Sequence, residues 1–350
     1  MVCQSLARLC QGFCKSLGAP RLTPAAPTSI VVPMINPTPD AIAAAAPLIA
    51  PHIRATPILS VEAEALALPC PVTFKLEHTQ ISGSFKLRGA FYNMLTRDVP
   101  AAGVVAASGG NHGGAVAYAA TKLGHASRIY VPRLIAKDEK LRRMRGFGAE
   151  VVLTDGSVAD CMDEYAAYAA KTGALSVHPY DTLPTLTGQG TVAREIEAQM
   201  AQSGHSGIDT ILVSTGGGGL IGGVAAWFRD RVKVVSVETE GTNTLEKSLR
   251  EGPDIDVPAS GIAAGSLGGP RLGVDSFAVI RTYVDEAVIV PDSAVFDAAT
   301  RLWDATRLIG EPGAAVALAA LTSGAYVPTR DERVCVLLCG GNAEPDWFVQ

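Results

Sequence analysis

Runs of apolar residues, many of them β-branched, recur along the chain from about residue 40 onward. The clearest runs predict strands at 103–108, 127–131, 150–154, 175–178, 210–215, 232–238 and 334–339. Alanine-rich stretches with helical spacing lie between most of them, as at 113–124 and 158–173. Continuous apolar strands that alternate with helices are typical of parallel sheets covered on both faces. The pattern therefore predicts an α/β fold of parallel-rich sheets covered by helices.

The first part of the chain does not follow this pattern. Residues 1–33 hold three basic residues and no acidic one, and they end in a proline-rich stretch. A cleaved secretory signal needs an apolar core, which is missing here. We therefore expect residues 1–37 to be a disordered N-terminal extension, with translation beginning upstream of a natural start at Met34 as one explanation.

Composition narrows the classes of function. Of the 350 residues, 48% are apolar and 18% are charged, as in soluble globular enzymes, and the net charge of −5 argues against nucleic acid as a partner. No apolar run is long enough to span a bilayer. The seven cysteines form no CxxC pair, so neither a disulfide framework nor a zinc ribbon is expected. These features favour a cytoplasmic protein.

Three of the predicted strands end in glycine-rich turns. The strand at 103–108 is followed by "GGNHGG", the strand at 210–215 by "GGGGLIGG" and the strand at 334–339 by "GGN". In open parallel sheets, ligands bind beyond the carboxyl ends of the strands. Backbone N–H groups at such turns bind anions, and consecutive glycines lose much entropy unless something approaches the backbone closely. The turns therefore predict a ligand site, with a phosphate at the tetraglycine turn.

The tetraglycine turn also fits a second interpretation. Gly217-x-Gly219-x-x-Gly222 matches the dinucleotide fingerprint, and Glu238 ends the next strand at a suitable distance. An NAD-dependent oxidoreductase is therefore an alternative. Two facts count against this alternative. The motif lies late in the chain, and a run of four glycines matches the fingerprint easily by accident.

Two further residues have an environment that suggests chemistry. Lys86 stands in the run "ISGSFKLRGA" among small and apolar residues. Desolvation lowers the pKa of a lysine and leaves more of the free amine to act as nucleophile or base. Cys339 ends the strand at 334–339 and either faces the same crevice or is a buried small hydrophobe, the more common case.

Taken together, "SGSFKLRGA", "SGGNHGG", "STGGGGLIGG" and "LLCGGN" resemble, in this order and spacing, the fold-type II pyridoxal-phosphate enzymes. Within that group the chain is most similar to the serine/threonine dehydratases (ammonia-lyases) and their relative serine racemase, from about residue 38 to the end. The resemblance implies a two-lobed fold like that of the tryptophan synthase β subunit. It implies a large cofactor-binding domain at 38–102 and 182–350, with a small inserted domain at 103–181.

The resemblance also implies a role for each residue of these motifs. Lys86 would form the Schiff base with pyridoxal 5'-phosphate and act as general base, Asn111 would bind the ring 3′-oxygen, and Cys339 would meet the pyridine nitrogen. The other expected cofactor contacts are Phe85, Gly216, Gly217, Gly218, Gly219 and the backbone of Leu220. The expected substrate contacts are Ser82, Ser108, Gly110, His112 and Tyr180, where simple packing of the Tyr180 segment is an equal alternative.

The implied reaction is elimination of water from L-threonine or L-serine, which yields a 2-oxo acid and ammonia, in an expected homodimer. A thiol at the pyridine nitrogen makes the ring a weak electron sink, which suits elimination. Serine racemases carry a second base, a serine, immediately after the position of Ser108. Here that position is Gly109, so two-base racemisation is disfavoured. A β-replacement enzyme and a serine or hydroxyaspartate racemase-dehydratase stay open as alternatives.

Metal and substrate choice complete the expectations. Some members bind a divalent cation through a glutamate like Glu238 and an aspartate, but this chain has Thr244 at the place of the aspartate. A hydroxyl replaces a carboxylate poorly, so no metal is expected, and Glu238 is kept as a candidate ligand. The sequence shows no extra arginine placed to receive a second substrate carboxylate, which favours serine and threonine. The chain ends soon after "CGGN", so feedback through a C-terminal regulatory domain is not expected.

Overall fold

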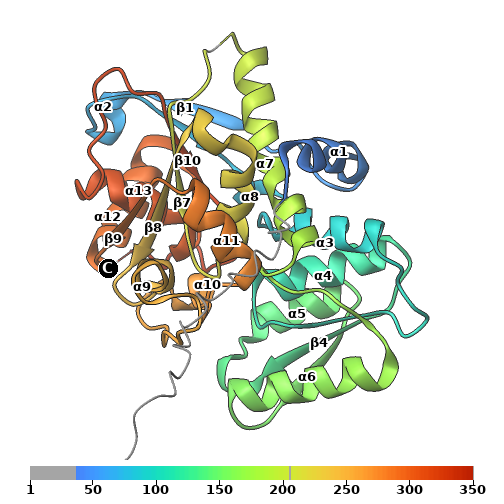
Figure 1. Cartoon of the computed structure of the whole chain (residues 1–350). Helices are drawn as coiled ribbons and strands as arrows, with labels where there is room; N and C mark the ends of the chain where they lie inside the picture. Colours follow the sequence, from blue (N-terminus) through green and yellow to red (C-terminus); the bar gives the residue numbers. More distant parts are fainter. Residues whose placement is uncertain (1–36, 205, 350) are drawn as a thin grey trace, which may run out of the picture. The chain divides into compact units, whose positions relative to one another are not determined.

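Two β-sheets organise the chain in the computed structural model, which describes residues 37–204 and 206–349 (Figure 1). The larger sheet has the strand order β1-β2-β10-β7-β8-β9, and the smaller sheet has the order β5-β4-β3-β6. All neighbouring strands are parallel except β1 and β2, which pair antiparallel. The strands are β1 (Ile58–Val61), β2 (Val72–Lys75), β3 (Val104–Ala107), β4 (Ser127–Pro132), β5 (Glu150–Thr154), β6 (Leu175–Ser176), β7 (Thr210–Ser214), β8 (Lys233–Thr239), β9 (Glu286–Val290) and β10 (Val334–Leu337).

Helices connect most of the strands, as right-handed crossovers between parallel strands require. The α-helices are α1 (Pro39–Ile49), α2 (Ala63–Leu66), α3 (Lys86–Thr96), α4 (Asn111–Lys122), α5 (Asp138–Gly146), α6 (Val158–Thr172), α7 (Leu183–Gln202), α8 (Gly219–Phe228), α9 (Thr244–Glu251), α10 (Ala264–Leu267), α11 (Val274–Tyr283), α12 (Asp292–Thr306) and α13 (Pro312–Thr322). Short 3₁₀ turns are η1 (Ala50–His52), η2 (Glu77–Thr79), η3 (Arg133–Ile135) and η4 (Arg229–Arg231).

Helices cover both faces of the larger sheet. Successive side chains of a strand point to opposite faces, so neighbours in β7 belong to different hydrophobic clusters. Ile211 and Val213 pack in the cluster that holds α7, α8 and α11. Leu212 packs in the cluster that holds α12 and α13. Burial on both faces explains why the central strands read as continuous apolar runs.

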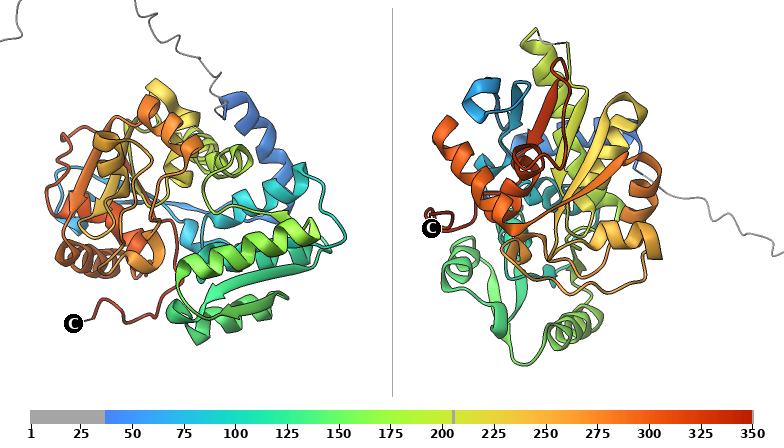
Figure 2. Two further views of the ribbon diagram at one scale, coloured as in Figure 1. Left: turned by 60° about the horizontal axis from the view of Figure 1, so that its bottom comes forward. Right: turned by 90° about the vertical axis from the view of Figure 1, so that its left-hand side faces the viewer.

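The smaller sheet is covered in the same way. Val104 and Ala106 of β3 pack in the cluster that holds α3, α4 and α5. Val105, between them, packs in the cluster that holds α6. Figure 2 shows these green strands and helices from two further directions. The four strands of this sheet come from one continuous stretch, 104–176.

The predicted strands are all present, and the prediction of an α/β fold is confirmed. Strands β1, β2 and β9 are not predicted by the pattern. β1 and β9 form the two edges of the larger sheet and are only partly buried, so neither needs a continuous apolar run. β2 is buried but ends in the charged Lys75. The domain boundaries stay a prediction, and the expected disordered extension lies, apart from residue 37, outside the described residues.

No helix in the described ranges is both long and apolar enough to cross a membrane.

The end of β10 lies against the segment that precedes α3. Ser84 and Gly340 form an antiparallel bridge, and the Phe85 N–H donates to the Cys339 carbonyl over 3.0 Å. Because α3 begins at Lys86, these contacts hold Lys86 next to the carboxyl end of β10.

Four charged side chains from β2, η2, α3 and α7 form a buried ion cluster. Arg88, which is 1% exposed, donates from Nε to Glu77 Oε2 over 2.9 Å and from Nη2 to Glu77 Oε1 over 2.6 Å. It also donates to Glu195 Oε2 over 3.0 Å, and Lys75 Nζ donates to Glu195 Oε1 over 2.6 Å. Each buried charge has a partner, which offsets the loss of water around it. The cluster ties the start of α3 to the larger sheet and to α7.

Removal of Arg88 would leave Glu77 buried without its main partner. Arg88→Ala is therefore expected to lower the free energy of unfolding by about 3–5 kcal/mol, measured by urea denaturation. The control Arg133→Ala breaks an exposed ion pair with Asp155 and should lower it by less than about 1 kcal/mol. Equal losses in the two variants would contradict a structural role for the buried ion cluster.

Candidate active site

Lys86 is the first residue of α3, and its amine points into the protein interior. Nζ donates to the Pro179 carbonyl over 2.7 Å and lies 4.9 Å from the centroid of the Phe85 ring. Burial lowers the pKa of Lys86 to about 8, although the nearby carboxyl group of Glu311 acts in the opposite direction. The neutral amine is therefore a substantial fraction of Lys86 at mildly alkaline pH.

Cys339 follows β10 and lies beside Lys86. Its side chain is 3% exposed and belongs to the same hydrophobic cluster as Phe85. Burial raises the pKa of the Cys339 thiol, with a further contribution from the charge of Glu311. Cys339 is thus a buried neutral thiol next to the segment that carries Lys86. Its contact with the pyridine nitrogen stays a prediction.

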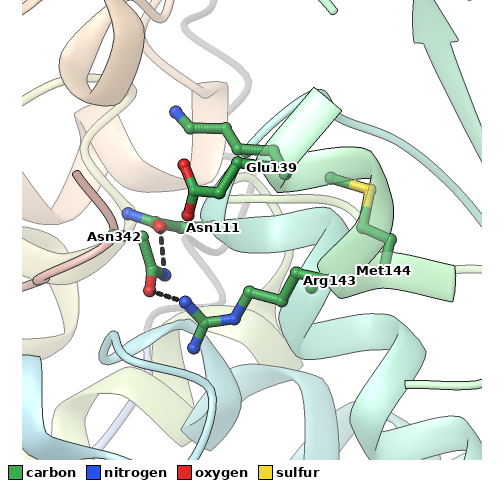
Figure 3. Close-up of a pocket in the computed structure, with 8 residues that line it drawn as sticks. Asn111, Glu139, Arg143, Met144 and Asn342 are labelled. Carbon is green, nitrogen blue, oxygen red and sulfur yellow. Dashed lines mark hydrogen bonds between the residues drawn. The ribbon is translucent and has the colours of Figure 1, made fainter. Parts of the chain in front are cut away.

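Asn111 begins α4, and hydrogen bonds hold both ends of its amide. Nδ2 donates to Glu311 Oε1 over 2.6 Å, and Oδ1 accepts from Asn342 Nδ2 over 2.6 Å. Asn342 Nδ2 also donates to the Ser82 carbonyl over 3.0 Å, and Figure 3 shows Asn342 between Asn111 and Arg143. A side-chain amide has two N–H donors, so one N–H of Asn111 is left for a ligand in a fixed orientation.

The tetraglycine turn leads from β7 into α8 and packs closely against the ring of Tyr180. Gly218 has φ +88°, a backbone conformation that favours glycine. A Cβ at Gly217 would overlap the ring of Tyr180, and a Cβ at Gly219 would lie 2.7 Å from Tyr180 Cα. No side chain caps α8, whose first turn includes the buried Leu220. The N–H groups of this turn are therefore open to an anion.

The segment 178–181 joins Lys86 to the tetraglycine turn. Its Pro179 carbonyl accepts the Lys86 hydrogen bond, and the ring of Tyr180 lies against the turn. His178 Nδ1 accepts from the N–H groups of Tyr180 and Asp181 over 3.3 and 2.8 Å. The two aromatic rings meet edge to face with centroids 4.8 Å apart. Tyr180 thus packs against the tetraglycine turn, and its contact with a substrate stays a prediction.

Three of the residues predicted to meet the substrate, Ser108, Gly110 and His112, lie in the turn after β3 or in the first turn of α4, whereas Ser82 precedes α3. Ser108 Oγ accepts from the Gly110 N–H over 3.2 Å, and Ser82 is 1% exposed. The His112 ring is directed elsewhere: Nε2 lies 2.8 Å from the Val177 carbonyl, and burial lowers the pKa of His112 to about 3. The neutral ring therefore uses its single N–H on the backbone, and a contact between His112 and a substrate stays a prediction.

The family of the chain follows from comparison with protein-family models. Residues 49–340 match the family described as pyridoxal-phosphate dependent enzyme, and this match covers most of the chain. The chain belongs to this family. The predictions of family, fold class and cofactor are confirmed.

Individual relatives agree with the family match. The chain is 34% identical to the L-threonine ammonia-lyase of Geobacter sulfurreducens, over 84% of this chain and 72% of the relative. It is 34% identical to the biosynthetic L-threonine dehydratase of Salmonella typhimurium, over 83% of this chain but only 56% of that relative's length. Among solved structures, a T.th. threonine deaminase matches with TM-score 0.82 and 32% identity, covering 88% of this chain and 99% of that one. Maize serine racemase matches with TM-score 0.81 and 30% identity, covering 88% and 94%.

The residues around Lys86 fit pyridoxal phosphate. Lys86 would bind the aldehyde carbon, and the tetraglycine turn with the open first turn of α8 would hold the phosphate. The unused N–H of Asn111 would bind the ring oxygen, and the neutral thiol of Cys339 would meet the pyridine nitrogen. The role of each residue stays a prediction.

The sequence analysis does not predict the residues that hold Asn111 in place. Glu311 is 2% exposed, and burial raises the pKa of its carboxyl group. Arg143, from α5, donates from Nη1 to Asn342 Oδ1 (Figure 3). Asn342 is part of the "CGGN" motif, whereas Glu311 and Arg143 stand in stretches without a local signal. Their contacts depend on elements far apart in the chain.

The structure gives Glu238 a structural contact. Its two carboxylate oxygens accept from the N–H groups of Leu245 and Glu246 over 2.7 and 2.9 Å, so Glu238 caps the start of α9. Burial raises the pKa of Glu238 to about 8, against these two hydrogen bonds. Across residues 37–204 and 206–349, no group of three or more His, Cys, Asp or Glu could hold a metal ion. A dinucleotide site would need Glu238 to accept hydrogen bonds from a ribose, but its carboxylate oxygens already accept from the N–H groups of α9.

The lowered pKa of Lys86 predicts how fast the apo-protein takes up pyridoxal phosphate at different pH values. Only the neutral amine attacks an aldehyde, so the rate should rise with pH to a midpoint near 8, below the ordinary lysine value of 10.5. Stopped-flow absorbance measures this rate, and parallel rates for Nα-acetyl-lysine correct for titration of the cofactor. A corrected midpoint near 10.5 would contradict the desolvation of Lys86.

Proposed function

We propose that the chain eliminates water from L-threonine and L-serine, and so produces a 2-oxo acid and ammonium. The observation that carries the proposal is a neutral thiol, Cys339, rather than a carboxylate beside the lysine expected to bind the cofactor. Similarity to proteins named L-threonine ammonia-lyase and threonine deaminase supports it.

Bound pyridoxal phosphate supplies an electron sink for the electron pair that a Cα–H bond leaves behind. A neutral thiol at the pyridine nitrogen does not hold that nitrogen protonated as a carboxylate does. Cys339 therefore keeps the sink weak, which favours prompt loss of the β-substituent over a long-lived carbanion. The packing of Cys339 in an apolar cluster maintains the neutral state of the thiol.

Lys86 is the proposed base. A lysine with its pKa near 8 is neutral often enough to accept the Cα proton and is still able to return it. The carbonyl of Pro179, 2.7 Å from Nζ, directs the amine toward one side of the site. Loss of the Cα proton and the β-hydroxyl amounts to loss of water, and hydrolysis of the released enamine returns that water and yields the 2-oxo acid and ammonium.

Asn111 orients the reacting group in this proposal. Glu311 and Asn342 fix both ends of the amide, so the remaining N–H points in one direction. Such preorganised hydrogen bonds stabilise a transition state without reorganisation during the reaction. We also propose that the protein acts in the cytoplasm as a homodimer, because the four cysteines in the described part of the chain are free and the family resemblance implies a dimer.

The test is an absorbance spectrum of the purified protein with L-threonine or L-serine, with the 2-oxo acid assayed in the same cuvette. The wild type should show a visible cofactor band and form oxo acid, and Lys86→Ala should lose at least about 1,000-fold in activity, the scale of general acid–base catalysis. A protein that shows the cofactor band but forms no oxo acid would favour a β-replacement enzyme instead. A protein that binds no pyridoxal phosphate would overturn it.

Gly109 provides a second test, which separates elimination from racemisation. A Cβ at Gly109 would meet Val131 and Ile135 at 3.4 and 3.6 Å, which is ordinary contact, so a side chain fits. Gly109→Ser is expected to fold and to form D-serine from L-serine at a rate at least about tenfold above the wild type, because it adds a second proton donor.

Gly109→Ala is the matched control for this substitution, since it fills the same space without a hydroxyl. Chiral chromatography of the amino acid after partial reaction measures the D-serine. Equal D-serine formation by the alanine and serine variants would contradict the idea that a second base at this position decides between the two reactions.

A further inference from the structure

One face of α5 turns two cations toward the candidate active site. Lys140 and Arg143 are three residues apart and so lie on the same side of the helix. With Met144 from the next position, they line a pocket whose other walls include Gly110 and Asn342 (Figure 3). The neighbouring arginines of α5, Arg142 and Arg145, are exposed.

Both cations approach the two turns that hold the expected substrate contacts Ser82 and Gly110. A Cβ at Gly83, next to Ser82, would lie 2.9 Å from Arg143 Nη2. A Cβ at Gly110 would lie 3.9 Å from Lys140 Nζ. Among the described residues, a side chain at Gly110 would otherwise meet only the Gly265 carbonyl within 4 Å. The two turns and the two cations of α5 therefore lie close to one another around the same small pocket.

The guanidinium of Arg143 has no carboxylate partner in the part of the chain that the structure describes. Neither Arg143 nor Lys140 takes part in an ion pair there. Two acids are near: Glu139 lines the same pocket, and Glu311 is bonded to Asn111. Within the same described ranges, the Asn342 amide oxygen is the one side-chain atom that accepts a hydrogen bond from Arg143.

This arrangement is unusual because charges taken out of water are normally paired. Arg143 is partly buried, and burial lowers the pKa of its guanidinium. Five N–H donors in a planar fork match a carboxylate in two parallel hydrogen bonds. A neutral amide oxygen uses only one side of that fork, so most of the donors remain available to an anion that enters the pocket.

We propose that Arg143 binds a carboxylate of the substrate, with Lys140 as a second cation at the same place. The proposal rests on the proposed function, since it concerns the substrate of that site. The sequence itself shows no arginine placed to receive a second substrate carboxylate, because the position of Arg143 beside Gly83 and Asn342 arises only in the folded chain. The carboxylate is either the α-carboxylate that every amino acid carries or a second one on the β-carbon, as in 3-hydroxyaspartate.

The first experiment measures binding without turnover, by calorimetry of the holoenzyme with malonate. Loss of a charged hydrogen-bond pair is worth about 1.5–3 kcal/mol, so Arg143→Ala should weaken malonate binding by about 10- to 100-fold. Arg143→Lys, which keeps the charge but not the fork, should lose less. Arg145→Ala removes an exposed arginine of the same helix and should bind malonate like the wild type.

The second experiment identifies which carboxylate is bound. Arg143→Ala should raise KM with little change in kcat, because it removes binding and not proton transfer. An equal rise for L-threonine and threo-3-hydroxyaspartate assigns Arg143 to the α-carboxylate. A rise for threo-3-hydroxyaspartate alone assigns it to the β-carboxylate. Added guanidinium should restore part of the activity of Arg143→Ala, which a purely structural arginine would not allow.

Unchanged malonate binding in Arg143→Ala would overturn the inference. So would a loss of binding in Arg145→Ala of the same size, since it would reflect general charge and not a site. If Arg143→Ala changes the cofactor spectrum but not the malonate affinity, Arg143 only positions Asn342. That result would also overturn the inference. If the wild type binds malonate but forms no oxo acid, the proposed function fails while the Arg143 site is still tested by the binding series.

Discussion

The ion pair between Arg88 and Glu77 is the constraint on which the rest of the site depends. Arg88 stands two residues after Lys86 in the same helix, and its guanidinium is bonded to a carboxylate that follows β2. A fully buried charge tolerates no loss of its partner, so the orientation of α3 is fixed relative to the larger sheet. The position of Lys86 is fixed with it. The Lys86 amine, which we propose as the reactive group, is therefore placed by an ion pair that itself takes no part in the proposed reaction.

Around this fixed lysine, the parallel arrangement of the strands gathers groups that are far apart in the chain. The ends of β3, β7 and β10 supply Asn111, the tetraglycine turn and Cys339, while Glu311 and Asn342 hold Asn111 in orientation. Burial gives the two ionisable groups at the centre their properties. It lowers the pKa of Lys86 and raises that of Cys339, so both are neutral more often than in water.

Much of this arrangement could be predicted from sequence, because it is local. Buried central strands read as continuous apolar runs, and glycine-rich turns mark the places where backbone must meet a ligand. Edge strands β1 and β9 carry no such run, because solvent covers part of them. The direction of the His112 ring toward Val177, the capping contacts of Glu238 and the contact between Arg143 and Asn342 are tertiary. No pattern within a short stretch reports them.

The central claim is that this fold makes one lysine, Lys86, the attachment point of pyridoxal phosphate. Borohydride reduction of the cofactor-loaded protein fixes the cofactor to its lysine, and mass spectrometry of the peptides locates it. The account predicts a pyridoxyl group on the peptide that contains Lys86 and on no other. Modification of Lys75 or Lys140 instead, or of several lysines equally, would contradict it.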